Sequence, residues 1–304
     1  MSLGHLDAFL GRSAGALCRS PIFIIGCPRS GTTALARALG QHSQLWTSHE
    51  SYFLNSLYGG GRAEDAWRRD AEREKAPSWL KTEEVSRQEF LGWLGAGVNA
   101  LYTSRSGGRR WIDQTPLNTL MVDDLADMFS GAVFVHIVRD GRHVVHSMEN
   151  FLRKFEQRED AKRYVPAWAT DFGEACRTWR TWVESATAFC QRNPERATTV
   201  VNERLSADPE TGFADLYRFL GLGPEQGPIT SFGAERVNSS FGESGRSPSS
   251  AADCLPRWDD DRRTTFAEEA GDLLVASGLA SPDELQDWVA GALHVRSTPA
   301  CGDG

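Results

Sequence analysis

An eight-residue loop near the start of the chain constrains the fold more than any other feature. Residues 22–25 (IFII) are a short apolar run, residues 26–33 read GCPRSGTT, and residues 34–39 show a helical pattern. This order predicts a strand, a tight loop and a helix. The backbone amides of such a loop, together with the N-terminus of the helix that follows, form a binding site for an anion.

The loop departs from the nucleoside-triphosphate P-loop, which reads GxxxxGK[ST]. Both glycines and Thr33 fit that pattern, but Thr32 stands where the lysine that reaches the β- and γ-phosphates would be. Arg29, inside the loop, offers a planar set of hydrogen-bond donors instead. The residues of the loop alone also allow a plain strand-to-helix turn with no ligand.

A second apolar run ends in an arginine. Residues 132–138 (AVFVHIV) suit a strand that is buried on both faces of a parallel sheet. In nucleotidases such a strand presents an aspartate that holds magnesium, whereas here Arg139 comes first. Because arginine binds anions directly and repels a metal ion, we expect phosphate or sulfate to bind without magnesium.

Ser147 extends this second motif. It lies eight residues beyond Arg139, near one face of a helix predicted to begin at Asp140, at a rise of roughly 12 Å. An extended arginine could therefore meet a phosphate that Ser147 also bonds. Taken alone, Ser147 could equally be an ordinary helix serine.

Strand and helix patterns alternate along the rest of the chain. They predict an α/β protein with a three-layer, P-loop-like fold, in which a central parallel sheet is flanked by helices. Further strands are predicted at 111–113 and 198–201, helices at 86–103, 140–154, 165–192 and 209–220, a charged helix or excursion at 62–75, a long loop at 228–250, and a last helical region after Trp258. We expect an N-terminal helix or tail over 1–20, a single domain over 21–296 and a disordered tail over 297–304.

Composition excludes several classes of protein. The 304 residues carry a formal net charge of −8 at pH 7, which argues against a nucleic-acid partner bound through a broad basic surface. The apolar runs are far too short for a membrane span, and residues 1–20 lack a secretory signal. The six cysteines include no CxxC pair and suit reduced thiols. We expect a cytoplasmic protein; a homodimer is left open.

Two alternative chemistries are disfavoured by spacing. His136, His143 and His146 have no carboxylate pair fixed beside them, so no metal is expected. Cys27 could be the nucleophile of a loop-cysteine phosphatase, but the Cys-x5-Arg spacing is absent, since Arg29 follows two residues later.

Taken in order, the motifs resemble those of the PAPS-dependent sulfotransferases, where PAPS is 3′-phosphoadenosine 5′-phosphosulfate. The similar segments are residues 28–33 (PRSGTT), residues 138–142 (VRDGR) with Ser147, residues 200–209 with 219–222, and residues 237–240. The resemblance covers about residues 20–280. It is greater to the bacterial and tyrosylprotein branch than to the cytosolic branch, which has a lysine in the loop and a histidine where Thr115 stands.

The resemblance implies a role for each motif. The loop would cradle the 5′-phosphosulfate, the arginine and serine of the second motif would bind the 3′-phosphate, and a late loop would close near the nucleotide. The residues implied to bind PAPS are Arg29, Ser30, Gly31, Thr32, Thr33, Arg139, Ser147, Asn238, Ser239 and Ser240.

The resemblance also implies the catalytic residues. Residues 42–50 (HSQLWTSHE) match in length a family segment that carries the catalytic base, which places Glu50 at the base, with His49 as the alternative. The residues alone allow Glu50 simply to start a helix. In the segment WIDQTP, Gln114 stands where many members have a lysine that assists the departing phosphate. Either Arg29 does that work alone, another basic residue fills in, or the activity is weak.

We therefore expect transfer of the sulfuryl group from PAPS to a hydroxyl of a small metabolite, sugar or glycolipid by in-line displacement. Three alternatives remain at this point. They are a protein-tyrosine sulfotransferase, a catalytically weak PAPS-binding protein of the same fold, and an unusual P-loop kinase.

Overall fold

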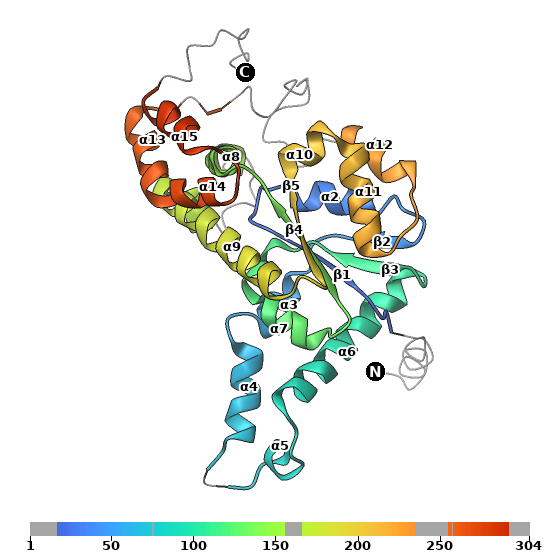
Figure 1. Ribbon diagram of the computed structural model, residues 1–304. Helices are drawn as coiled ribbons and strands as arrows, with labels where there is room; N and C mark the ends of the chain where they lie inside the picture. The colour runs from blue at the N-terminus through green and yellow to red at the C-terminus, as the bar shows by residue number, and fades with distance from the viewer. Residues whose placement is uncertain (1–16, 75, 156–165, 235–254, 257, 292–304) are drawn as a thin grey trace.

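A parallel five-stranded sheet forms the centre of the computed structural model, which describes residues 17–74, 76–155, 166–234, 255–256 and 258–291. The strand order is β2-β3-β1-β4-β5, and every pairing is parallel (Figure 1). The strands are β1 (Ile22–Ile25), β2 (Leu45–Thr47), β3 (Arg110–Asp113), β4 (Val133–Val138) and β5 (Ala197–Val201). The predicted α/β class with a parallel sheet is confirmed.

Helices connect the strands and cover both faces of the sheet. Those before β4 are α2 (Thr32–Leu39), α3 (Tyr52–Tyr58), α4 (Arg62–Ala71), α5 (Trp79–Thr82), α6 (Arg87–Ser106), the 3-10 helix η1 (Pro116–Met121) and α7 (Val122–Met128). Those after β4 are α8 (Gly141–Phe155), the 3-10 helix η3 (Ala167–Ala169), α9 (Phe172–Arg192), α10 (Asn202–Ala207), α11 (Pro209–Leu220), α12 (Gln226–Ala234), α13 (Asp260–Phe266), the π-helix η5 (Ala267–Gly271), α14 (Asp272–Ala276) and α15 (Pro282–Val289).

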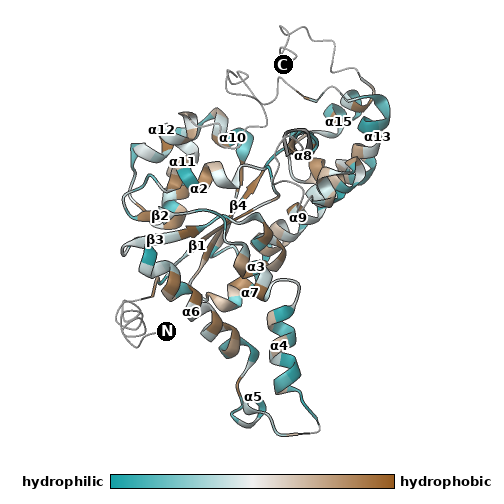
Figure 2. Ribbon diagram, turned by 180° about the vertical axis from the view of Figure 1, so that it is seen from behind, coloured by the Kyte–Doolittle hydropathy of each residue, from teal (hydrophilic) through white to brown (hydrophobic). Residues whose placement is uncertain are grey.

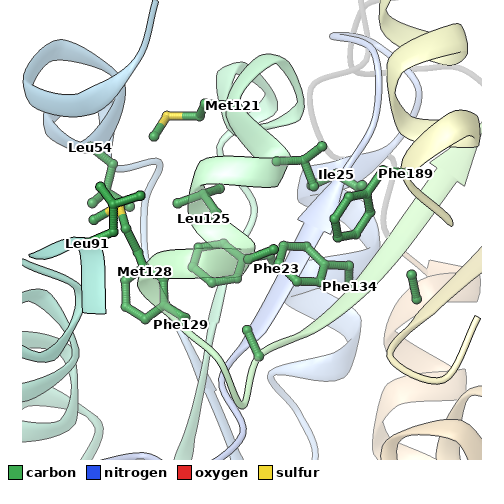
Figure 3. Close-up of a cluster of buried hydrophobic side chains, with 14 of the residues drawn as sticks. Phe23, Ile25, Leu54, Leu91, Met121, Leu125, Met128, Phe129, Phe134 and Phe189 are labelled. Carbon is green, nitrogen blue, oxygen red and sulfur yellow. The ribbon is translucent and has the colours of Figure 1, made fainter. Parts of the chain in front are cut away.

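The alternation of side chains along β1 separates the two faces of the sheet, because successive residues of a strand point to opposite sides. Ile22 and Ile24 pack in a cluster with the apolar residues of α2 and α11, whereas Phe23 and Ile25 pack in a cluster with those of α7 and α9. The second cluster centres on Phe23, and Figure 3 shows its ring beside Phe134. These two apolar layers make the three-layer arrangement of helix, sheet and helix.

The charge-rich stretch predicted near residues 62–75 contains α4, which extends with α5 away from the sheet (Figure 1). The helix is mostly hydrophilic, in contrast to the apolar strands β1 and β4 (Figure 2). Arg87, at the start of α6, ties α4 to α7 through ion pairs with Glu64 and Asp124. The projecting helix α4 is therefore fixed to the rest of the domain near its first turn.

The structure differs from the predicted secondary structure in three places. The strand β2 was missed because it has only three residues, of which Leu45 alone is buried. The helix predicted over 165–192 is divided, because the side chain of Asp171 caps a new helix by accepting from the Glu174 amide.

The third correction concerns the loop predicted over 228–250. Residues 226–234 are helical as α12, in which Pro228 occupies the first turn, where a missing N–H costs no helical hydrogen bond. The remainder of that predicted loop, and the tails over 1–16 and 297–304, lie outside the described residues.

Within the described residues, no helix combines the length and the apolar composition that crossing a bilayer would require.

Truncating Phe134 should destabilise the protein strongly. The side chain is fully buried on β4, stacks on Phe23 at 5.5 Å between ring centroids and meets Phe189 edge-on at 4.7 Å. We expect Phe134→Ala to lower the free energy of unfolding by about 3–5 kcal/mol, measured by urea denaturation. Trp93→Ala is the control, since that side chain is 72% exposed and should change stability by no more than about 0.5 kcal/mol. Equal losses in the two variants would contradict this description of the core.

Candidate functional site

The loop of residues 26–33 leaves β1 in close contact with β4. A Cβ atom on Gly26 would lie 2.5 Å from the backbone oxygen of Ile137, so this position requires glycine. Gly31 precedes α2 with a φ of 102°, in the left-handed region, and a Cβ there would lie 2.5 Å from Nδ2 of Asn202. The two glycines therefore allow the backbone itself, with its amides, to form the surface of the loop.

Arg29, Arg139 and Ser147 converge on this loop. Nε of Arg29 donates to Oγ of Ser147 at 3.1 Å, and Arg139 donates to the backbone oxygen of Arg29 at 3.3 Å. The backbone of Arg29 has a φ of 72°, which is uncommon for a residue other than glycine. Two residues more than a hundred positions further along the chain thus fix Arg29, Ser147 through the Arg29 side chain and Arg139 through the Arg29 backbone.

The electrostatics of the cluster favour an anion. Burial lowers the pKa of Arg29, the neighbouring Arg139 lowers it further, and Glu50 acts in the opposite direction. Burial also lowers the pKa of Arg139, against the opposing effect of Glu203 and Asp140. Two half-buried guanidinium groups that influence each other's charge repel, and an anion bound between them would relieve that repulsion.

Two buried polar atoms at the loop have no hydrogen-bond partner among the described residues. They are Oγ of Ser30 and Nε of Arg139. Buried polar groups are nearly always hydrogen-bonded, so unmatched donors at this place indicate a site for a ligand rich in acceptor oxygens. The residues present therefore fit the phosphate groups of a nucleotide such as PAPS.

Asn202 and Glu203 support the loop, and sequence reasoning gave them no individual role. Nδ2 of Asn202 donates to the backbone oxygen of Ser30 at 3.2 Å, and Glu203 accepts from the Asp140 amide at 3.0 Å. Both residues lie in the segment 200–209, which resembles the sulfotransferases as a whole. The signal that could have identified them is their position, directly after a strand that ends at the same edge of the sheet.

Glu50 lies between β2 and α3, and its carboxylate accepts a hydrogen bond from the Tyr52 hydroxyl. It is half-buried and close enough to Arg29 to influence the pKa of that guanidinium, whereas His49 is exposed. The alternative that Glu50 only starts a helix is not supported, because Ser51 is the N-cap of α3 and Glu50 precedes it. The structure therefore brings Glu50 near the loop.

Gln114 is buried at the end of β3. Its Nε2 donates to the backbone oxygen of Ser48 at 2.7 Å, and its Oε1 accepts from Thr47 at 3.1 Å. Both polar atoms of the amide are thus engaged by the segment that leads to Glu50.

Comparison with known proteins identifies the family. The sequence model of the sulfotransferase family matches residues 21–226, which include the loop, Arg139, Ser147 and Glu203. This chain belongs to the sulfotransferase family. The helices α13, η5, α14 and α15 lie beyond the matched range.

Individual relatives are distant. A candidate protein-tyrosine sulfotransferase of Caenorhabditis briggsae is 23% identical over 202 residues, which cover 66% of this chain and 65% of that protein. Protein-tyrosine sulfotransferase 1 of Danio rerio is 25% identical over 203 residues, which cover 66% of this chain and 53% of that protein. The chain thus spans less than two thirds of the length of these curated relatives.

Among solved structures, sulfotransferase STF1 of Mycobacterium tuberculosis H37Rv is similar at 18% identity. The match covers 76% of this chain and 75% of that chain, with a TM-score of 0.49. The family model and the tyrosylprotein relatives confirm the predicted resemblance to the sulfotransferase family.

The remaining predicted site residues fall into two groups. Within this member of the sulfotransferase family, Ser30 and Thr32 are buried in the loop, and Gly31 and Thr33 are half-buried at the start of α2. Asn238, Ser239 and Ser240, which were predicted to close near the nucleotide, lie outside the described residues.

The histidines do not form a metal centre in the described part of the chain. His136 is buried within β4, where burial lowers its pKa to about 4. In residues 17–291, apart from the gaps given above, no group of three or more histidine, cysteine or carboxylate side chains is placed to hold a metal ion.

Cys27 is a core thiol in this structure, since its side chain is fully buried and burial raises its pKa well above the usual value. A neutral thiol is a poor nucleophile, which argues against the loop-cysteine phosphatase. We expect Cys27 to resist iodoacetamide at pH 8 in the native protein and to react fully in denaturant, as measured by mass spectrometry of the loop peptide. Rapid modification of the native protein at Cys27 would contradict this account.

Proposed function

We propose that this sulfotransferase moves the sulfuryl group of PAPS to a hydroxyl group of an acceptor by in-line displacement. The observation that carries the proposal is the convergence of Arg29, Arg139 and Ser147 on a glycine loop that has unmatched buried donors. Membership of the family supports PAPS as the donor, since the family generally uses it. The arginine in place of a Walker-B aspartate supports binding without a metal.

The residues of the loop would hold the 5′-phosphosulfate. Negative charge builds on the bridging oxygen of the departing phosphate as the sulfur–oxygen bond breaks. The loop amides and the Arg29 guanidinium would stabilise that charge, and preorganised donors of this kind are usually the largest catalytic contribution. Arg139 and Ser147 would bind the 3′-phosphate, in keeping with the predicted role of the second motif.

Glu50 would act as the general base. Its carboxylate would take the proton of the acceptor hydroxyl while the hydroxyl oxygen attacks sulfur. The attack forms a new oxygen–sulfur bond and releases adenosine 3′,5′-bisphosphate. The Tyr52 hydroxyl already donates to this carboxylate, which supports its ability to bind a hydroxyl group. His49 is the alternative base on the same segment.

The acceptor is proposed to be a small metabolite, sugar or glycolipid. A tyrosine hydroxyl of a protein is the second candidate, favoured by the names of the two relatives from Caenorhabditis briggsae and Danio rerio. Transfer of labelled sulfate from PAPS to tyrosine peptides, compared with transfer to sugars and lipids, distinguishes the two. A PAPS-binding protein of weak activity would bind the bisphosphate without transfer. The cytoplasmic location and the homodimer stay predictions.

Replacing Glu50 should lower the turnover and leave nucleotide binding unchanged. We expect Glu50→Gln to lower turnover at least about a hundredfold, since general-base catalysis is worth about 10²–10⁴-fold, and to leave the Kd for adenosine 3′,5′-bisphosphate unchanged. Glu72→Gln, on the exposed end of α4, is the matched control and should retain wild-type turnover. Near-normal turnover of Glu50→Gln would remove Glu50 from the role and direct attention to His49.

Removing the Arg139 side chain should weaken the binding of the 3′-phosphate only. We expect Arg139→Ala to weaken binding of adenosine 3′,5′-bisphosphate at least tenfold and to change binding of adenosine 5′-monophosphate much less, both measured by titration calorimetry. In thermal unfolding, the wild-type protein should be stabilised by the bisphosphate and not by ATP with magnesium. A wild-type shift with ATP alone would revive the kinase alternative, and equal losses for the two nucleotides in Arg139→Ala would refute the assignment.

A further inference from the structure

The segment that carries Glu50 is attached to the end of β3 on both sides of that residue. Before it, Nε2 of Gln114 donates to the Ser48 backbone oxygen at 2.7 Å, and Thr47 donates to Oε1 of the same amide at 3.1 Å. After it, the Ser51 amide donates to Oγ1 of Thr115 at 2.6 Å. Three hydrogen bonds, two of them to backbone atoms, therefore hold the segment that presents the proposed base.

Asp113, the neighbour of Gln114, makes the end of β3 a firm support. Its buried carboxylate accepts from the Ser51 hydroxyl, from the Tyr102 hydroxyl at 2.8 Å, from the Thr115 amide at 2.9 Å and from Nδ2 of Asn118 at 3.1 Å. Hydrogen bonds to a charged group are stronger than those between neutral groups. Residues 113–115 are thus fixed both to the core helices and to the Glu50 segment.

The chemistry of the Gln114 position differs from what a lysine could provide. The side chain is 3% exposed and uses its amide both as a donor and as an acceptor. A lysine ammonium has donors only, so it could not accept from Thr47, and its burial without a partner carboxylate would be costly. Glutamine suits the site because the site needs both functions.

We propose that Gln114 is a positioning residue that fixes the Glu50 segment against β3, and that it does not assist the departing phosphate. The stabilisation of that phosphate then falls to Arg29 and the loop amides. This inference rests on the proposed function, in which Glu50 is the base. Because a small misplacement of a reacting group can cost about a hundredfold in rate, the attachment matters for turnover.

A double-mutant cycle tests this role. We expect Gln114→Met to lower kcat about ten- to a hundredfold with the Kd for adenosine 3′,5′-bisphosphate unchanged, because methionine keeps the volume and loses both hydrogen bonds. In the Glu50→Gln background the same change should cost almost nothing, since it acts through Glu50. If Gln114→Met lowers kcat by the same factor in the Glu50→Gln background as in the wild type, Gln114 acts on the phosphate directly, and the proposal is overturned.

Gln114→Lys gives an independent comparison. If the glutamine merely stood in for a lysine that assists the phosphate, this variant would raise kcat. We expect it to lower kcat at least as much as Gln114→Met. Gln226→Met is the matched control, because Gln226 bonds Glu210 on the exposed surface and its loss should leave kcat unchanged.

Hydrogen exchange separates failure of this inference from failure of the proposed function. The Ser51 amide and its neighbours should exchange at least tenfold faster in Gln114→Met than in the wild type, with no change in β1 and α2. Unchanged exchange would overturn the positioning role even if no acceptor is ever found. Faster exchange in a protein that transfers no sulfate from PAPS would contradict the proposed function alone.

Thr47→Val provides a second test if Gln114→Met does not fold. It removes one of the two hydrogen bonds of the Gln114 amide, so it should show a smaller increase in the exchange rate of the same amides.

Discussion

The parallel pairing of β1 with β4 is the constraint on which the site depends. Its register sets Ile25 opposite His136, so the loop leaves β1 at Gly26 while β4 continues toward Arg139. Because Gly26 has no side chain, the loop backbone lies against the Ile137 carbonyl, and Arg139 can reach the backbone of the loop. The carboxyl ends of adjacent parallel strands are the usual place for ligands in open α/β sheets, and here that edge collects positive charge.

The loop keeps an unfavourable backbone conformation at Arg29 because neighbouring side chains hold it there. Arg29 adopts a left-handed backbone conformation, which costs on the order of 1 kcal/mol or more for a residue with a side chain. Arg139, Asn202 and Ser147 compensate through hydrogen bonds to Arg29 and to the adjoining Ser30. Such an arrangement positions a guanidinium before a ligand arrives, so binding does not have to order it.

The sequence predicted the parts of the site that follow from local pattern, and missed those that depend on contacts between distant segments. The apolar runs and turn residues predict the loop and β4 directly, whereas the hydrogen bond from Arg29 to Ser147 joins residues 118 positions apart. The role of Gln114 depends on the register of β2 against β3 and joins residues 66 positions apart, which no local pattern encodes. The strand β2 itself is too short to show an alternation.

The burial of Arg142 ties the C-terminal helices to the site. This side chain, 1% exposed near the start of α8, bonds Asp140 and Glu284 and lies over the Trp288 ring at 5.4 Å. The same helix carries Ser147, so the packing of α15 and the placement of this serine, which we propose binds phosphate, share one support. Coupling between the C-terminal helices and the nucleotide site is reciprocal. If the packing of these helices raises the affinity for a nucleotide, a bound nucleotide must stabilise their packing by the same free energy.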